Sequence, residues 1–88
     1  MPTISSFNGI TIRMFFADNQ GHNKPHIHAY HGEHHAVVGL DGELLAGSIP
    51  HKKLTLLQGW IVLREQELYQ AWNKAVRNIP PGKITPLK

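Results

Sequence analysis

A histidine-rich stretch, PHIHAYHGEHH at residues 25–35, leaves this chain few ways to fold. Apolar and polar side chains alternate on both sides of Gly32-Glu33, which is the pattern of two half-buried β-strands. A two-residue connection with glycine first is typical of a tight β-hairpin. The pairs that this hairpin predicts are His31 with His34, Tyr30 with His35, His28 with Val37, and Ile27 with Val38.

The predicted register sorts the side chains of the hairpin onto two faces, because successive residues of a strand point to opposite sides. The apolar face carries Ile27, Ala29, Ala36 and Val38. The polar face carries His26, His28, Tyr30 and His35. An apolar face of this kind is stable only when a core covers it, so we expect the hairpin to be the centre of a sheet with one packed face.

Further strand patterns surround this hairpin. Residues 4–7 and 10–16 read as strands joined by Asn8-Gly9, a strong signal for a tight hairpin. Asp41-Gly42 marks another hairpin, which we expect to place Val38 opposite Leu45. Together these patterns predict an antiparallel β-meander of four to five strands over residues 3–47.

The second half of the chain changes to a helical pattern. Apolar residues recur at spacings of three, four and seven over residues 49–78, which marks one buried stripe. A continuous helix from Pro50 to Arg77 would be about 42 Å long, whereas a typical strand spans about 17–20 Å. We therefore predict an α+β fold, in which the meander packs against one long or broken C-terminal helix. An extended tail follows at residues 79–88.

Two arrangements of the helix remain open, a break near Arg64 or a far end that projects beyond the sheet. No glycine or proline lies between Trp60 and Pro80, so we favour the continuous helix. Its far half would leave an apolar patch in water, and such patches usually mark interfaces. The expected homodimer interface consists of Leu68, Trp72 and Val76.

Composition narrows the class of protein. Eighty-eight residues suit a single domain over residues 1–88, and the absence of cysteine excludes disulfides and thiolate metal sites. No apolar run approaches the ~18 residues of a membrane-spanning helix, and the first residues lack the segments of a secretory signal. We therefore expect a cytoplasmic protein without a membrane partner. Its formal net charge of +3 permits a weak attraction to anions, nucleic acid included.

The polar face of the hairpin offers a candidate metal site. Three neutral imidazoles that converge from adjacent strands suit zinc or another borderline divalent metal. The ligands would be His26, His28 and His35, with His22 or Asp18 from the preceding loop as a fourth. The alternative is that these imidazoles fill a half-buried polar surface beside Tyr30.

Catalysis has weaker support than binding. The histidine cluster suits acid–base chemistry, including nuclease-like hydrolysis with Arg13 or Lys24 as the cation. The sequence carries no Ser/His/Asp signature, phosphate-binding glycine loop or paired-carboxylate motif. The balance is therefore against an enzyme.

A short basic cluster, His51-Lys52-Lys53, lies in the expected first turn of the helix. Positive charge there opposes the helix dipole, whereas a phosphate bound at the free backbone N–H groups would be attracted. The cluster is thus a candidate anion-binding site. The alternative, which we favour, is a solvated basic turn.

Five segments carry a resemblance along nearly the whole chain: MPTIS at residues 1–5, GITIRM at 9–14, PHIHA at 25–29, GELLAGSIP at 42–50, and Trp60 with the Glu67–Trp72 segment. In this order they resemble the small prokaryotic proteins grouped as domain of unknown function family 4160. The core motif of that family reads Pro-His-Phe-His-Ala, and this chain has isoleucine in place of phenylalanine. The resemblance implies that His26 and His28 are the signature pair, without assigning them a role.

Members of that family often look like halves of small two-gene units. The resemblance therefore implies a toxin–antitoxin-like or regulatory role. We expect a binding or regulatory module that acts through a protein partner, with nucleic acid as a further partner class. The alternative is a histidine metal-binding protein, structural or hydrolytic, that uses the His26/His28/His35 face.

Overall fold

The computed structural model describes residues 3–15 and 24–87. The described residues form five strands and two helices, in the order β1 (Thr3–Phe7), β2 (Ile10–Arg13), β3 (His26–His31), β4 (His34–Gly39), β5 (Leu44–Ser48), α1 (His51–Leu63) and α2 (Glu65–Ala75). The strands form one antiparallel sheet in the order β1-β2-β3-β4-β5. The predicted α+β fold with an antiparallel meander is confirmed.

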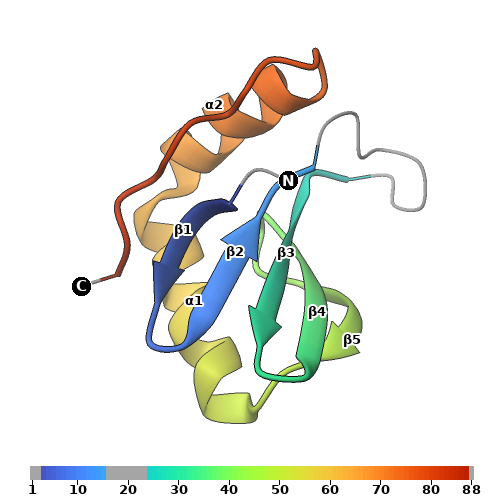
Figure 1. Ribbon diagram of the computed structural model, residues 1–88, viewed down its shortest axis with the longest axis vertical. Coiled ribbons are helices and arrows are strands. Elements are labelled where there is room, and N and C mark those ends of the chain that lie inside the picture. The colour runs from blue at the N-terminus through green and yellow to red at the C-terminus, as the bar shows by residue number, and fades with distance from the viewer. Residues whose placement is uncertain (1–2, 16–23, 88) are drawn as a thin grey trace.

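Both helices lie on the same side of the sheet (Figure 1). The core fills the space between these two layers, and its fully buried side chains include Ile4, Ile12, Ile27 and Val38 from the strands and Leu57, Trp60 and Leu68 from the helices. The C-terminal tail runs back past α2 and β1 in the same view, and the backbone N–H of Ile84 donates to the carbonyl of Ile4 at 2.7 Å. Within the described ranges, neither helix is long and apolar enough to cross a membrane.

The β3–β4 hairpin has the register that the sequence predicts. The six pairs run from His26 with Gly39 to His31 with His34. Gly32 occupies the first turn position with φ of +59°, a left-handed conformation that glycine adopts without strain. The apolar set predicted for one face of this hairpin is accordingly buried.

The expected pairing of β4 with β5 is wrong by one residue at the end near the turn. Val38 pairs with Leu44 rather than Leu45, because the register shifts between Val37 and Val38, whereas the three pairs from Val37 to His35 follow the predicted register. The turn is also wider than a two-residue loop. The N–H of Gly39 donates a hydrogen bond to the carbonyl of Glu43 at 2.7 Å, which closes the turn.

The favoured continuous helix is also wrong, since the chain leaves the helical conformation at Arg64, where φ is −112° and ψ is 22°. The second helix then folds back over the sheet instead of projecting from it. Leu68 becomes fully buried and Trp72 only 9% exposed, so neither belongs to an exposed interface. Val76 packs against the same core and is half-buried.

The break at Arg64 has a physical reason that outweighs the lack of glycine or proline. Burying two large apolar side chains within the chain is worth several kcal/mol at ~25 cal/mol per Å² of apolar surface. Glu65 and Glu67 also lie in the first turn of α2, where negative charge interacts favourably with the helix dipole. One residue outside the helical region is therefore enough to redirect the helix.

Lys24 connects the start of β3 to the turn between β4 and β5. Its ammonium group forms ion pairs with Asp41 at 2.7 Å and with Glu43. The hydrogen bond to Asp41, followed by the one to Glu43, raises the pKa of Lys24 well above its usual range. The same bond from Lys24, with one from the backbone N–H of Glu43, lowers the pKa of Asp41. All three groups are solvated, so their effect on stability is small.

The position of α2 predicts that two leucines near the break lose very different amounts of unfolding free energy when each is replaced by alanine. Leu68 is fully buried, whereas Leu63 is 65% exposed. We expect Leu68→Ala to lower the free energy of unfolding by about 2–4 kcal/mol, because it leaves a cavity in the core. Leu63→Ala, the matched control, should change it by less than about 0.5 kcal/mol. Urea denaturation followed by tryptophan fluorescence measures both, and equal losses would contradict the folded-back helix.

Candidate functional site on the open sheet face

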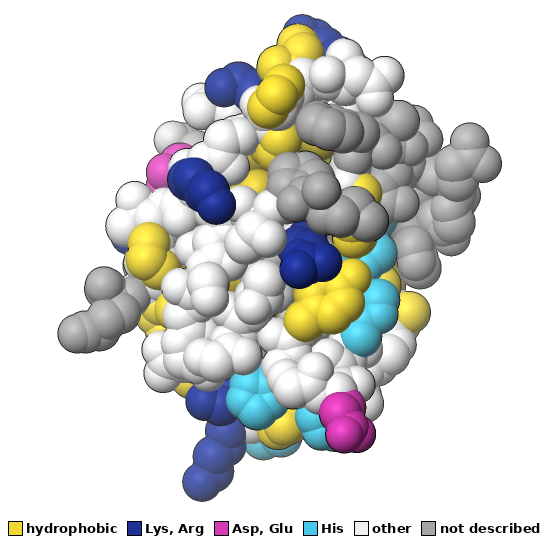
Figure 2. All heavy atoms as spheres, in the orientation of Figure 1, with side chains coloured by type: hydrophobic (Ala, Val, Ile, Leu, Met, Phe, Trp, Pro, Cys, Tyr) yellow, Lys and Arg dark blue, Asp and Glu magenta, His cyan; other side chains and the backbone are white. Residues whose placement is uncertain are grey.

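We call the face of the sheet directed away from the helices the open face. Two rows of paired residues cross it: Thr11, Tyr30, His35 and Ser48 in one row, and Arg13, His28, Val37 and Ala46 in the other. Figure 2 shows histidine side chains, hydrophobic side chains and one Lys or Arg side chain side by side over this part of the sheet. The hydrophobic class in that figure includes tyrosine. The five strands contain no aspartate or glutamate. This face is therefore polar and aromatic, and without negative charge from the strands.

His28 and His35 form a hydrogen-bonded pair at the centre of the open face. Nδ1 of His28 and Nε2 of His35 are 3.1 Å apart, and their ring planes differ by only 19°. The ring centroids are 5.3 Å apart, so the rings meet edge to edge rather than face to face. One ring donates its N–H and the other accepts it. The pair thus presents one extended, nearly flat surface.

Tyr30 lies between Arg13 and His35. Its ring is parallel to that of His35, with centroids 4.4 Å apart, and the guanidinium carbon of Arg13 is 5.2 Å from its centroid. Arg13 comes from β2 and His35 from β4, the two strands that flank β3. A cation–π contact of this kind holds the guanidinium in place without neutralising it.

Arg13 has no ion-pair partner among the described residues. Its Nε is buried, and the N–H there donates to no acceptor within the same residues. Phe15, two residues further along the chain, packs its ring against His28 edge-on, with centroids 4.5 Å apart. The open face therefore combines a held but unneutralised cation with a group of planar side chains.

His26 lies beside His28 but is buried. Its ring centroid is 5.4 Å from that of His28 and 5.1 Å from that of Trp72 on α2, and the residue is 1% exposed. Its Nδ1–H donates to the carbonyl of Lys24 at 2.9 Å. The sequence pattern could not show the contact with Trp72, because that contact depends on the position of α2.

The predicted three-histidine ligand set is therefore not assembled. In residues 3–15 and 24–87, no group of three His, Asp or Glu side chains is arranged to hold a metal ion. The proposed fourth ligands, His22 and Asp18, lie outside the described residues. In a tetrahedral zinc site two ligand nitrogens lie about 3.3 Å apart and both lone pairs point at the ion, whereas a hydrogen bond joins nitrogens that point at each other. The 3.1 Å between His28 and His35 suits a shared proton instead.

The basic cluster at the start of α1 is partly occupied by structural contacts. Lys53 donates to the backbone carbonyl of Asn8 at 2.9 Å, which connects α1 to the β1–β2 turn. His51 and Lys52 are exposed. This arrangement favours the solvated basic turn over the predicted anion site.

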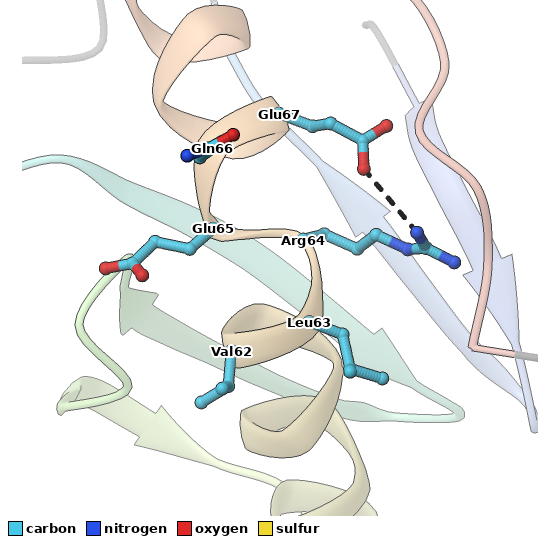
Figure 3. Close-up of a pocket in the computed structure, with 6 residues that line it drawn as sticks. All are labelled: Val62, Leu63, Arg64, Glu65, Gln66 and Glu67. Atoms are coloured by element: carbon cyan, nitrogen blue, oxygen red, sulfur yellow. Dashed lines mark ion pairs between the residues drawn. The ribbon is translucent and has the colours of Figure 1, made fainter.

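A pocket lies at the joint between the two helices, lined by Val62, Leu63, Arg64, Glu65, Gln66 and Glu67. Figure 3 shows Arg64 and Glu67 pointing to one side, where they form an ion pair at 3.6 Å, and Glu65 pointing to the other. The lining side chains include no imidazole, hydroxyl or thiol, and Arg64 pairs with one of the two carboxylates. The chemistry of the chain is concentrated on the open face instead.

Sequence reasoning does not include Thr11, Phe15, Ala46 and Ser48 in the candidate site. The signal for Thr11 and Phe15 is present in the sequence, since they alternate with the apolar residues of the second strand and so belong to the opposite face. The sequence pattern assigns Ser48 to a helix entry, because serine followed by a proline two residues later is typical of one. The predicted pairing of Val38 with Leu45, continued along the strands, sets Ser48 opposite His35, and this pair is observed.

The two environments of histidine predict a difference in stability. We expect His26→Ala to lower the free energy of unfolding by about 2–4 kcal/mol, because the change removes a buried ring and a hydrogen bond. His34→Ala, at an exposed position of the same hairpin, should cost less than about 0.5 kcal/mol. Urea denaturation measures the free energy of unfolding of both variants and of the wild type. A His26→Ala protein as stable as the wild type would mean that His26 is not a core residue.

Comparison with known families gives one match. The model of a family described as "Domain of unknown function (DUF4160)" matches residues 9–73 of the chain. That range contains every residue of the open face described above. No curated protein and no solved structure matches the chain.

Proposed function

This chain belongs to the DUF4160 family, whose function is unknown. From its geometry we propose that it is a binding module that holds its partner against the open face. The observation that carries this proposal is the planar group formed by Arg13, Tyr30, His35 and His28. Tightly packed and partly exposed aromatic and arginine side chains are typical of recognition surfaces.

The distribution of apolar side chains supports the open face over the helices as the binding element. The apolar sides of α1 and α2 are buried in the core, which contains Leu57, Trp60, Leu68 and Trp72. The open face has no helix packed on it within the described residues (Figure 1). The side chains on it that do not serve the core are therefore available for a partner.

The same geometry supports binding rather than catalysis. The chemistry-bearing histidines lie on a sheet surface, whereas the pocket described above lies at the helix joint. An enzyme needs a concave site that excludes water and positions a substrate. The expected regulatory role in a two-gene unit would use this surface to hold a partner molecule.

Photo-cross-linking tests the proposed surface even though the partner is unidentified. We expect p-benzoylphenylalanine at Ser48, on the open face, to give covalent adducts in cells that produce the protein. The same group at Gln70, exposed on α2, is the control and should give none. Adducts removed by protease identify a protein partner, and adducts removed by ribonuclease identify RNA. Adducts from Gln70 alone, or from neither position, would contradict the proposal.

A second candidate function, metal binding, is favoured by the approach of His28 Nδ1 and His35 Nε2 on neighbouring strands. A divalent ion would replace the shared proton after a small rotation of the two rings. We expect zinc binding that weakens as the pH falls through ~6, since the ligands must be neutral imidazoles. Titration calorimetry with zinc chloride should lose the signal in His35→Ala and keep it in His34→Ala. Equal heats from both variants would exclude this pair as the site.

A further inference from the structure

We infer that the partner of the open face is a single-stranded RNA segment, with one base stacked against the ring of His35. This inference rests on the proposed binding function of that face. Four observations support it: the geometry of the imidazole pair, the small side chains beside it, the charge of the face, and the hydroxyl groups in the same row.

His35 offers an aromatic ring to a ligand. Tyr30 stacks on one face of the His35 ring, with centroids 4.4 Å apart. His35 is nevertheless an exposed residue, on a strand that pairs with β5. The hydrogen bond to His28 fixes the orientation of His35 and extends its plane. A planar, pre-oriented aromatic surface is what a nucleobase stacks on.

The end of β5 next to His35 carries small side chains. Ala46 pairs with Val37 and Ser48 pairs with His35, and both are exposed. Between them, Gly47 has φ of +70°, and a Cβ there would lie 2.2 Å from the carbonyl oxygen of His35. A larger residue at position 47 would therefore disturb the pairing of β4 with β5. The two small exposed side chains, Ala46 and Ser48, leave His35 accessible from the side of β5.

The charge of the face suits a phosphate backbone. Arg13 is held over Tyr30 without a carboxylate partner among the described residues, and the strands contain no acidic residue. In Figure 2 the acidic side chains lie at the margins of this face. The chain also carries a net charge of +3. A partner with negative charge and planar groups meets both conditions, as a nucleic acid does.

Hydroxyl groups at both ends of one row favour RNA over DNA. Thr11 pairs with Tyr30 and Ser48 pairs with His35, so the row Thr11-Tyr30-His35-Ser48 is flanked by two hydroxyls. A ribose 2′-hydroxyl both donates and accepts hydrogen bonds, and it is the group by which proteins distinguish RNA. The row spans about 14 Å across four strands spaced by about 4.8 Å. Other RNA-binding sheets seat two or three bases.

Fluorescence anisotropy with a labelled twelve-nucleotide oligouridine tests the inference on the purified full chain. We expect His35→Ala to weaken binding about 5- to 100-fold, the usual effect of losing one base-stacking side chain. His34→Ala, a histidine beside the hairpin turn, is the matched control and should bind as the wild type does. His35→Phe, which keeps a ring without its nitrogens, should retain most of the affinity. Circular dichroism confirms that each variant is folded.

Arg13→Gln tests the electrostatic part separately. The slope of log K against log salt concentration should fall by about 0.7 when one phosphate contact is lost. An unchanged slope would remove Arg13 from the binding surface.

Three results would overturn the inference. They are no binding of the oligonucleotide by the wild type, equal loss in His35→Ala and His34→Ala, and equal affinity for the DNA of the same length or for an acidic peptide. If RNA binding fails while the cross-linker at Ser48 still captures a protease-sensitive adduct, the RNA inference is wrong and the binding module stands. If the cross-linker also gives no adduct, the proposed function itself is wrong.

Discussion

The pairing of β3 with β4 determines which side chains this protein buries and which it presents. Because side chains alternate along a strand, a slip of one residue would exchange the two faces of the hairpin. The observed register buries Ile27 and Val38 and brings His28 and His35 together on the opposite side. The core and the open face are thus two results of one set of hydrogen bonds, and neither can change without the other.

The folded-back helix divides the histidines of this hairpin into two kinds. Trp72 of α2 packs on His26 at the start of β3, and the carbonyl of Lys24 takes up its Nδ1–H. Farther along the strand, His28 hydrogen-bonds to His35, and its ring lies 5.4 Å from that of His26. Histidines of similar sequence context therefore have separate roles, one in packing and two in a surface pair.

Local patterns in the sequence are sufficient for the parts of the fold that depend on neighbouring residues. The glycine-first turn and the alternation around it give the whole register of β3 and β4. The break at Arg64 is not predictable in the same way, because it depends on the tertiary burial of Leu68 and Trp72 rather than on a breaking residue. The edge-to-edge contact of His28 with His35 depends on side-chain rotamers, which register alone does not determine.

The contacts of Arg13 differ from those of three other cations. Lys24 is held by Asp41 and Glu43, Lys53 by the carbonyl of Asn8, and Arg64 by Glu67. Each of these contacts joins or ends an element of structure. Arg13 instead lies over a tyrosine ring on a face whose strands contain no carboxylate. The Nε of Arg13 and that of Arg64 are both buried without a hydrogen-bond partner among the described residues, so the distinction between the two arginines is the carboxylate that only Arg64 has. Because a positive charge held in place without an opposite charge attracts anions, we propose the open face, rather than the basic turn of α1, as the part of the molecule that an anionic partner would contact.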